Sequence, residues 1–139
     1  RSAASGTGSD SLRVRLNGNT TGNYSWHVLR GTGGAVQTTG AFNQTSITPS
    51  SSVFPRTSYT DQYGAAVLSV LDFHNPDNSK TVKINQGAAS DYNAFTQTCI
   101  AGGALNNNTG ALTSLTLSEG STVGFGAGSR FSIYGIRGE

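Results

Sequence analysis

The sequence predicts an all-β fold, an antiparallel β-sandwich of the jelly-roll type with about eight strands. The first observation is a two-residue alternation of apolar and polar side chains, which recurs in short segments along the chain. The second is composition: only 12% of the 139 residues are charged, while glycine reaches 19 residues and Ser, Thr and Asn are abundant. Such polar side chains compete for backbone hydrogen bonds in a helix interior and favour strands and turns. The third is spacing, because turn signals separate the segments at intervals of roughly 8 to 12 residues.

The length of the chain allows one domain with a single core. Apart from Arg1 and Asp10, residues 1–10 are Ser, Gly, Ala and Thr, which bury too little apolar surface to become ordered alone. We therefore expect a flexible N-terminal arm at residues 1–10, which becomes ordered by lying on a neighbouring molecule, and a single β-sandwich domain at residues 11–139.

Strand signals begin directly after this arm. Residues 12–16 alternate Leu, Arg, Val, Arg and Leu, and an Asn- and Gly-rich turn follows them. Residues 24–30 then place two aromatic side chains and a valine on one face, and residues 35–38 form a short strand after a glycine-rich turn. Two alternating strands and one short strand are thus predicted in the first 38 residues.

The middle of the chain combines a long polar passage with the most apolar segment. Residues 40–62 are interrupted by Pro49 and Pro55 and are too long for a simple turn, so we expect them to be functional or to cross between sheets. Residues 65–73 are apolar on both faces, which is typical of a strand covered on both sides and predicts a place at the centre of the fold. A further strand is expected at residues 81–85.

The last part of the chain predicts one more strand and a closing hairpin. Residues 92–100 alternate and contain the single cysteine, for which we expect a buried position. Residues 112–118 and 129–136 alternate on either side of a Gly- and Ser-rich loop, which predicts antiparallel partners. In this hairpin, Phe131 and Ile133 share the face that we expect to anchor the core.

No constellation of catalytic or metal-binding residues stands out in the sequence. His27 and His74 lack ligand-like neighbours, and Asp72, Asp77 and Asp91 lie far apart without the spacing of a calcium loop or a carboxylate pair. Structural roles are favoured for all five residues. The sequence predicts a protein that is not an enzyme and uses no cofactor and no metal.

The distribution of charge and of apolar residues also bears on possible partners. The lysines and arginines never form a run, so the positive surface that phosphate binding needs is not indicated and no nucleic-acid partner is expected. No uninterrupted apolar segment approaches the ~20 residues of a membrane-spanning helix, so no membrane partner is expected either.

The block at residues 128–136, Gly-Ser-Arg-Phe-Ser-Ile-Tyr-Gly-Ile, resembles the ending of many tailed-phage structural proteins. Residues 12–24 and 112–117 also look like segments of such proteins, so the resemblance covers most of residues 11–137, with its specific part at the end. It implies an antiparallel β-sandwich without catalysis, used on capsids as a cement or decoration protein or on tails in fibres and spikes. A compact domain without fibre repeats favours the capsid use and is similar to the jelly-roll cement proteins of short-tailed phages such as those that infect Bordetella.

This resemblance implies partners and a location. The expected partners are the major capsid protein and the chain itself, as a homodimer or trimer, on the outer capsid surface of the virion. The expected contacts come from the arm, from the long passage and from the outer face of the last strand. The interface residues that we predict are Arg1, Ser2, Asp10, Phe54, Arg56, Tyr59, Arg130 and Tyr134.

Two alternatives from other classes stay open. A receptor-binding or carbohydrate-binding module of a tail fibre or spike would present two or three exposed aromatic rings on one plane. A small β-sandwich hydrolase would depend on Asp72 or His74.

Overall fold

A computed structural model describes residues 1–5, 8–32, 34–49, 52–56, 62–88, 97–106, 110–120 and 123–136. These residues form eight β-strands and no helix, which confirms the all-β prediction. Accordingly, the described part of the chain contains no helix that could span a membrane. The strands are β1 (Ser9–Leu16), β2 (Tyr24–Thr32), β3 (Ala35–Gln44), β4 (Ser52–Pro55), β5 (Gly64–Leu71), β6 (Lys80–Ala88), β7 (Gln97–Leu105) and β8 (Leu115–Glu119).

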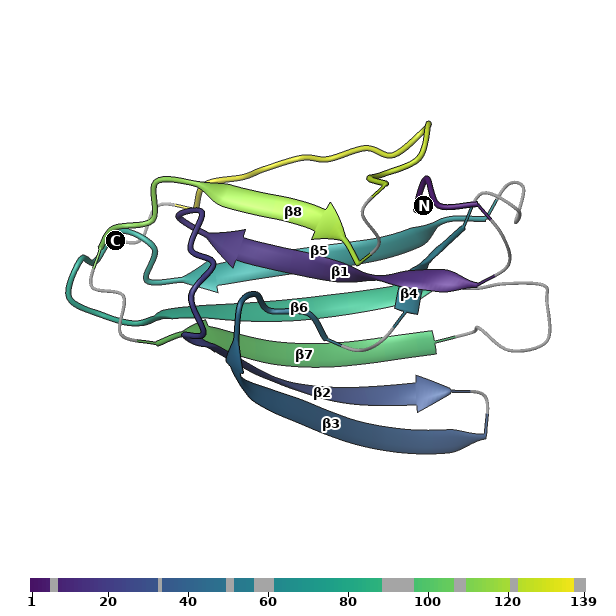
Figure 1. Ribbon diagram of the computed structural model, residues 1–139, viewed down its shortest axis with the longest axis horizontal. Coiled ribbons are helices and arrows are strands. Elements are labelled where there is room, and N and C mark those ends of the chain that lie inside the picture. Colours follow the sequence, from purple (N-terminus) through teal and green to yellow (C-terminus); the bar gives the residue numbers. More distant parts are fainter. Residues whose placement is uncertain are drawn as a thin grey trace.

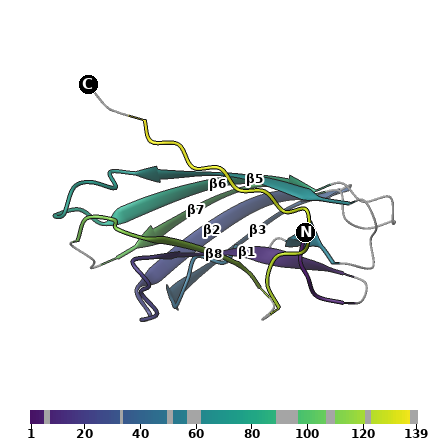
Figure 2. The same cartoon turned by 90° about the horizontal axis from the view of Figure 1, so that it is seen from above.

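The strands form two antiparallel sheets that lie face to face as two layers (Figures 1 and 2). The three-stranded sheet has the order β4-β1-β8, and the five-stranded sheet has the order β3-β2-β7-β6-β5. Strand β1 pairs with β8 in one layer and β2 pairs with β7 in the other, while β5, β6 and β7 form a meander. The expected β-sandwich is therefore confirmed.

The passage at residues 40–62 is not all connection, because residues 40–44 continue β3, which is longer than the short strand expected at residues 35–38. After β3 the chain crosses from the five-stranded sheet to β4 in the three-stranded sheet, which agrees with the expected crossing between sheets. Midway along it, Ile47 forms a bridge with Val14 of β1: each backbone N–H donates to the other residue's carbonyl, at 3.0 and 2.9 Å. The side chain of Ile47 is fully buried against β7, where a Cβ added at Gly103 would lie 2.8 Å from it. Glycine at this position of β7 therefore makes room for the crossing chain.

The core lies between the sheets, because alternation gives each paired strand one apolar face. Tyr24 is fully buried there, and its hydroxyl accepts from the Leu16 N–H at 2.9 Å and donates to the Leu16 carbonyl at 3.2 Å. Burial raises the pKa of Tyr24. Cys99 is buried as expected. The other core residues are Leu12, Val14, Leu16, Trp26, Val28, Ile47, Phe54, Val82, Ile84, Ala101 and Leu105.

The predicted closing hairpin is wrong. Strand β8 pairs with β1, in a register that runs from Leu12↔Glu119 to Leu16↔Leu115, and residues 129–136 form no strand. Phe131 and Ile133 are exposed and are not core anchors. An alternating pattern shows that a segment can enter a sheet, but it does not say which strand will be its partner.

The turn between β8 and the last segment is held by hydrogen bonds at the end of β8. The buried carboxylate of Glu119 accepts from the N–H groups of Val123 and Gly124, at 3.0 and 2.7 Å. Gly124 and Gly128 have φ angles of 93° and 85°, values that suit glycine and not other residues. The turn is thereby fastened at the end of β8, and the chain then runs back in the opposite direction without pairing with that strand (Figures 1 and 2).

The position of β5 is a second correction. The most apolar segment was expected at the centre of the fold, but β5 is the outermost strand of the five-stranded sheet. Leu68 and Val70 pack partly against the core, whereas Val67, Leu71 and Phe73 are exposed. One face of β5 meets the second sheet and the other does not, so apolar residues on both faces did not mark a strand covered on both sides.

The N-terminal segment also differs from the expectation of a flexible arm at residues 1–10. Strand β1 already begins at Ser9, and residues 1–5 lie against the body of the same chain. Ser2 is fully buried, its N–H donates to the Pro55 carbonyl at 3.1 Å, and the Ala3 N–H donates to the Gly124 carbonyl at 2.8 Å. Backbone hydrogen bonds order this segment, although its side chains offer little apolar surface.

Candidate interaction surfaces

Several predicted interface residues lie together at one end of the sandwich, where they contact other residues of the same chain and not a partner. The guanidinium of Arg56 donates to both carboxylate oxygens of Asp10, at 3.2 and 3.1 Å, and this hydrogen bonding raises the pKa of Arg56. Asp10 is buried, which makes the pair a local link between β1 and the end of β4. These two side chains therefore satisfy each other within one molecule.

Phe54 is also turned inward at this end. It is buried, and its ring meets Phe125 edge to face with centroids 5.6 Å apart. Phe125 in turn meets Phe131 at 4.9 Å. The three rings form a row from the core to Phe131, near the start of the last segment, residues 129–136. Phe54 therefore helps to hold that segment and is not exposed to a partner.

Arg1 also lies at this end of the sandwich and contacts its own chain. Its carbonyl accepts from the Gly126 N–H at 2.8 Å, and its guanidinium lies 5.6 Å from the centre of the Tyr63 ring. Ser2, beside it, is fully buried. Tyr59 falls outside the described residues.

The remaining predicted residues, Arg130 and Tyr134, lie in an exposed extended segment. We call residues 129–136 the tail. The tail begins beside the N-terminus, and its far end lies away from both sheets (Figure 2). The structure thus leaves Arg130 and Tyr134 accessible and separates them from the buried cluster at Ser2, Asp10 and Phe54.

A second accessible surface, which the sequence reasoning missed, is the face of the five-stranded sheet turned away from the core. We call it the outer face. One row of residues crosses all five strands, and a second parallel row lies beside it. The first row is Thr38, Leu29, Ile100, Asn85 and Val67, and the second is Gly40, His27, Gly102, Lys83 and Ser69.

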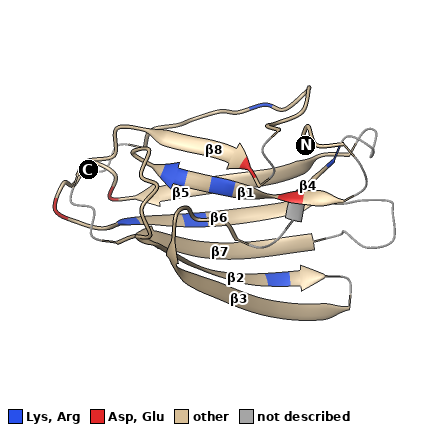
Figure 3. Cartoon of the chain, in the orientation of Figure 1, with Lys and Arg blue, Asp and Glu red and all other residues tan. Residues whose placement is uncertain are grey.

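The outer face is apolar at many positions and carries little charge. Large exposed apolar side chains there are Val36, Phe42, Leu29, Ile100, Val67 and Leu71. Lys83 is the one lysine or arginine on the described positions of this face. Among the described residues, Lys, Arg, Asp and Glu are spread over both sheets and the loops (Figure 3).

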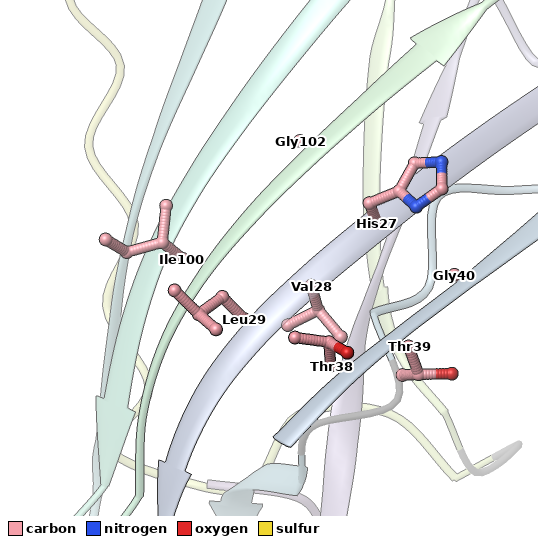
Figure 4. A pocket seen from close by; sticks show the side chains of 8 residues that line it. All are labelled: His27, Val28, Leu29, Thr38, Thr39, Gly40, Ile100 and Gly102. Atoms are coloured by element: carbon pink, nitrogen blue, oxygen red, sulfur yellow. The ribbon is translucent and has the colours of Figure 1, made fainter. Parts of the chain in front are cut away.

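A shallow depression of about 550 Å³ lies in the outer face, open to solvent. Figure 4 shows the imidazole of His27 projecting from β2 beside it, with Gly40 and Gly102 on the flanking strands. The two glycines leave room: a Cβ at Gly40 would lie 2.4 Å from His27 Nδ1, and a Cβ at Gly102 would meet nothing within 4 Å. The ring of Phe42 meets His27 edge to face at 5.4 Å.

The described residues contain no cluster of three or more His, Cys, Asp or Glu side chains that could hold a metal ion. The ionisable side chains that are buried serve the fold. Lys80 Nζ donates to the carbonyls of Asn75 and Asn78, the latter at 2.7 Å, and so closes the loop between β5 and β6. His74 is exposed on that loop, and the carboxylate of Asp72 accepts from the Asn78 amide at 2.5 Å.

No protein-family model, curated protein or solved structure matches this chain.

Proposed function

We propose that this protein is a virion structural protein, a capsid cement or decoration protein that binds the outer surface of the major capsid protein shell and stabilises it. It acts by binding and not by catalysis. The observation that carries the proposal is the outer face, a broad, weakly charged sheet surface with large exposed apolar side chains. Exposed apolar side chains that lie together on a soluble domain mark interaction sites, and Leu29 and Ile100 are exposed neighbours on this face. The resemblance of residues 128–136 to tailed-phage structural proteins supplies the kind of partner.

The outer face suits a protein that lies flat on a shell. Five strands hold its rows of side chains in a fixed register, so contacts over the surface form without much ordering of the backbone. Leu29 and Ile100 are direct neighbours on β2 and β7, near the middle of the sheet, where contacts with a partner would be best shielded from water. They are the two residues that we expect to contribute most to capsid binding.

The test uses capsids assembled without this protein. Replacing Leu29 and Ile100 by Asp should lower affinity for such capsids by at least about tenfold, because a charge would be buried in the contact. Thr116→Asp is the matched control: Thr116 is exposed on β8 in the other sheet, so this variant should bind as the parent chain does. Bound parent protein should also raise the temperature at which the capsids open. Capsids that are equally heat-resistant with and without it would contradict the proposal.

The alternative is a carbohydrate-binding or receptor-binding module of a tail fibre or spike. The observation in its favour is the pairing of His27 with Phe42 beside the open depression, since a flat ring next to polar groups can hold a sugar. Binding to a glycan array that is lost on Phe42→Ala, together with a few copies per virion in place of a full coat, would favour this alternative over cement.

A further inference from the structure

The tail has the sequence of a strand and has no strand partner among the residues that the structure describes. Its apolar residues lie on both sides of the chain, and Phe131, Ile133, Tyr134 and Ile136 expose 60, 84, 85 and 88% of their surface. Within the described residues, residues 130–136 make no backbone hydrogen bond. β-Branched and aromatic residues in an extended chain are stabilised by pairing and by cross-strand contacts. The tail therefore offers both an unpaired backbone and a large apolar surface to an external strand.

Strand β5 offers the complementary edge. It is the last strand of the five-stranded sheet, so among the described residues one side of its backbone has no strand partner. Free edges are usually protected by charged residues or proline, but Gly64–Leu71 contains neither. Val67 and Leu71 are exposed on the outer face, and Leu68 and Val70 are partly exposed toward the core side. A sixth strand added here would find apolar neighbours on both faces.

The tail starts close to β5. A Cβ at Gly128 would lie 2.9 Å from the hydroxyl of Tyr63, the residue directly before β5, so the tail leaves the body beside the first end of this strand. From there the tail and β5 run in the same direction (Figures 1 and 2). Residues 129–136 and Gly64–Leu71 also have equal length, which allows pairing along the whole strand.

Charge decides between pairing within one chain and pairing between two. If the tail paired with β5 of its own chain, the strands would be parallel and Arg130 would lie near Tyr63, where the guanidinium of Arg1 already lies. If a second copy supplied the tail, the strands could be antiparallel. Arg130 would then lie at the other end of β5, beside the exposed carboxylate of Asp72.

We propose that the tail pairs antiparallel with the free edge of β5 in a second copy of this chain, and that the exchange is reciprocal. Each copy contributes one tail and one edge, which is the self-complementary contact of a two-fold symmetric dimer. Backbone pairing would give the contact its register, and the apolar side chains of both faces would give it affinity. This inference does not depend on the capsid proposal, because it concerns the isolated protein in solution.

The first test measures the mass of the whole chain in solution by light scattering. The parent should be a dimer, and Ile133→Pro should be a monomer, because proline removes a backbone donor and disturbs the added strand. The thermal stability of the Ile133→Pro monomer should equal that of the parent monomer, since Ile133 makes no backbone hydrogen bond to the described parts of its own chain. Gly135→Ala is the control: a Cβ there meets nothing within 4 Å, and the dimer should remain.

The second test examines the direction of the pairing. Arg130→Gln and Asp72→Asn should each weaken the dimer by about two- to fivefold, the range expected of an exposed ion pair. The double variant should be no weaker than either single one, because the two charges act on each other. Asn retains the left-handed backbone of Asp72, whose φ is 55°. Additive effects would overturn the antiparallel arrangement.

Three outcomes would overturn the exchange as a whole. One is a parent chain that stays monomeric even at millimolar concentration. A second is an Ile133→Pro chain that stays dimeric. The third is a monomeric parent whose capsid binding is lost on Ile133→Pro, which would assign the tail to the shell and leave the capsid proposal standing.

Discussion

The N-terminal segment, residues 1–5, meets the described part of the chain after β8 only at residues 124–129, and the fold treats this segment and the tail in opposite ways. Residues 1–5 are small and mostly polar, yet Ser2 and Ala4 are buried and the backbone is hydrogen-bonded to β4 and to the turn after β8. The tail is aromatic and β-branched, yet its residues 130–136 are exposed and make no backbone hydrogen bond to the described parts of the chain. The comparison teaches that burial follows available hydrogen-bond partners as well as apolar side chains. Each of the following experiments changes one end and uses the other as its reference.

The largest effect is expected from removing each end in turn. Deleting residues 1–5 should lower the free energy of unfolding by about 2–3 kcal/mol, because three backbone hydrogen bonds at Arg1, Ser2 and Ala3 are lost, each contributing about 1 kcal/mol. Ending the chain after Phe131, which keeps the ring contact with Phe125, should change it by less than about 0.5 kcal/mol in the monomer. Urea unfolding monitored at low protein concentration measures both. Equal losses would show that the two ends contribute alike and would remove the contrast.

An intermediate effect is expected from one methyl group placed at each end. Gly126→Ala should destabilise by about 1 kcal/mol, because its Cβ would lie 3.1 Å from both Arg1 Cγ and the Ser2 carbonyl oxygen. Gly135→Ala, in the tail, has open space around it and should leave the midpoint of thermal unfolding unchanged. A Gly126→Ala chain as stable as the parent would mean that the N-terminal segment gives way easily and is held less firmly than its hydrogen bonds imply.

The smallest effect on stability is expected from the tail side chains. Ile133→Ser and Tyr134→Ser should each change the free energy of unfolding of the monomer by less than about 0.5 kcal/mol, since exposed side chains away from special features contribute little. Phe131→Ala should cost more than either, because its ring packs on Phe125. Urea unfolding of the three variants side by side gives the order. A loss above about 2 kcal/mol for Ile133→Ser would place this residue in the fold of its own chain.

Much of the strand pattern could be predicted from local sequence. The alternation in β1 and β2 correctly assigned the faces of Val14 and Trp26, and the burial of Cys99 followed from its place in an alternating segment. Turn chemistry separated these strands correctly. Such predictions succeed because the direction of a side chain in a strand is set by its own backbone, with a period of two residues.

The candidate surfaces were less accessible to sequence reasoning. Leu29 and Ile100 were recognisable as residues on the face opposite Val28 and Cys99, but both faces of these strands carry apolar side chains. Only the assembled fold shows that the three-stranded sheet covers one face and leaves the other open. A signal was present in the sequence, since Gly102 falls between outward apolar positions where a purely structural sheet face would carry polar side chains.

The sequence by itself therefore determined that the chain forms short strands, which residues of each strand share a face, and that no large helix competes with them. Tertiary structure alone decided that β8 pairs with β1, that β5 is an edge of its sheet, that Ser2 is buried and that residues 129–136 join no strand among the described residues. The physical reason is the range of the interactions. Alternation is encoded within a few residues, whereas a strand's partner is chosen by hydrogen bonds to a backbone that is distant in the sequence and can belong to another molecule.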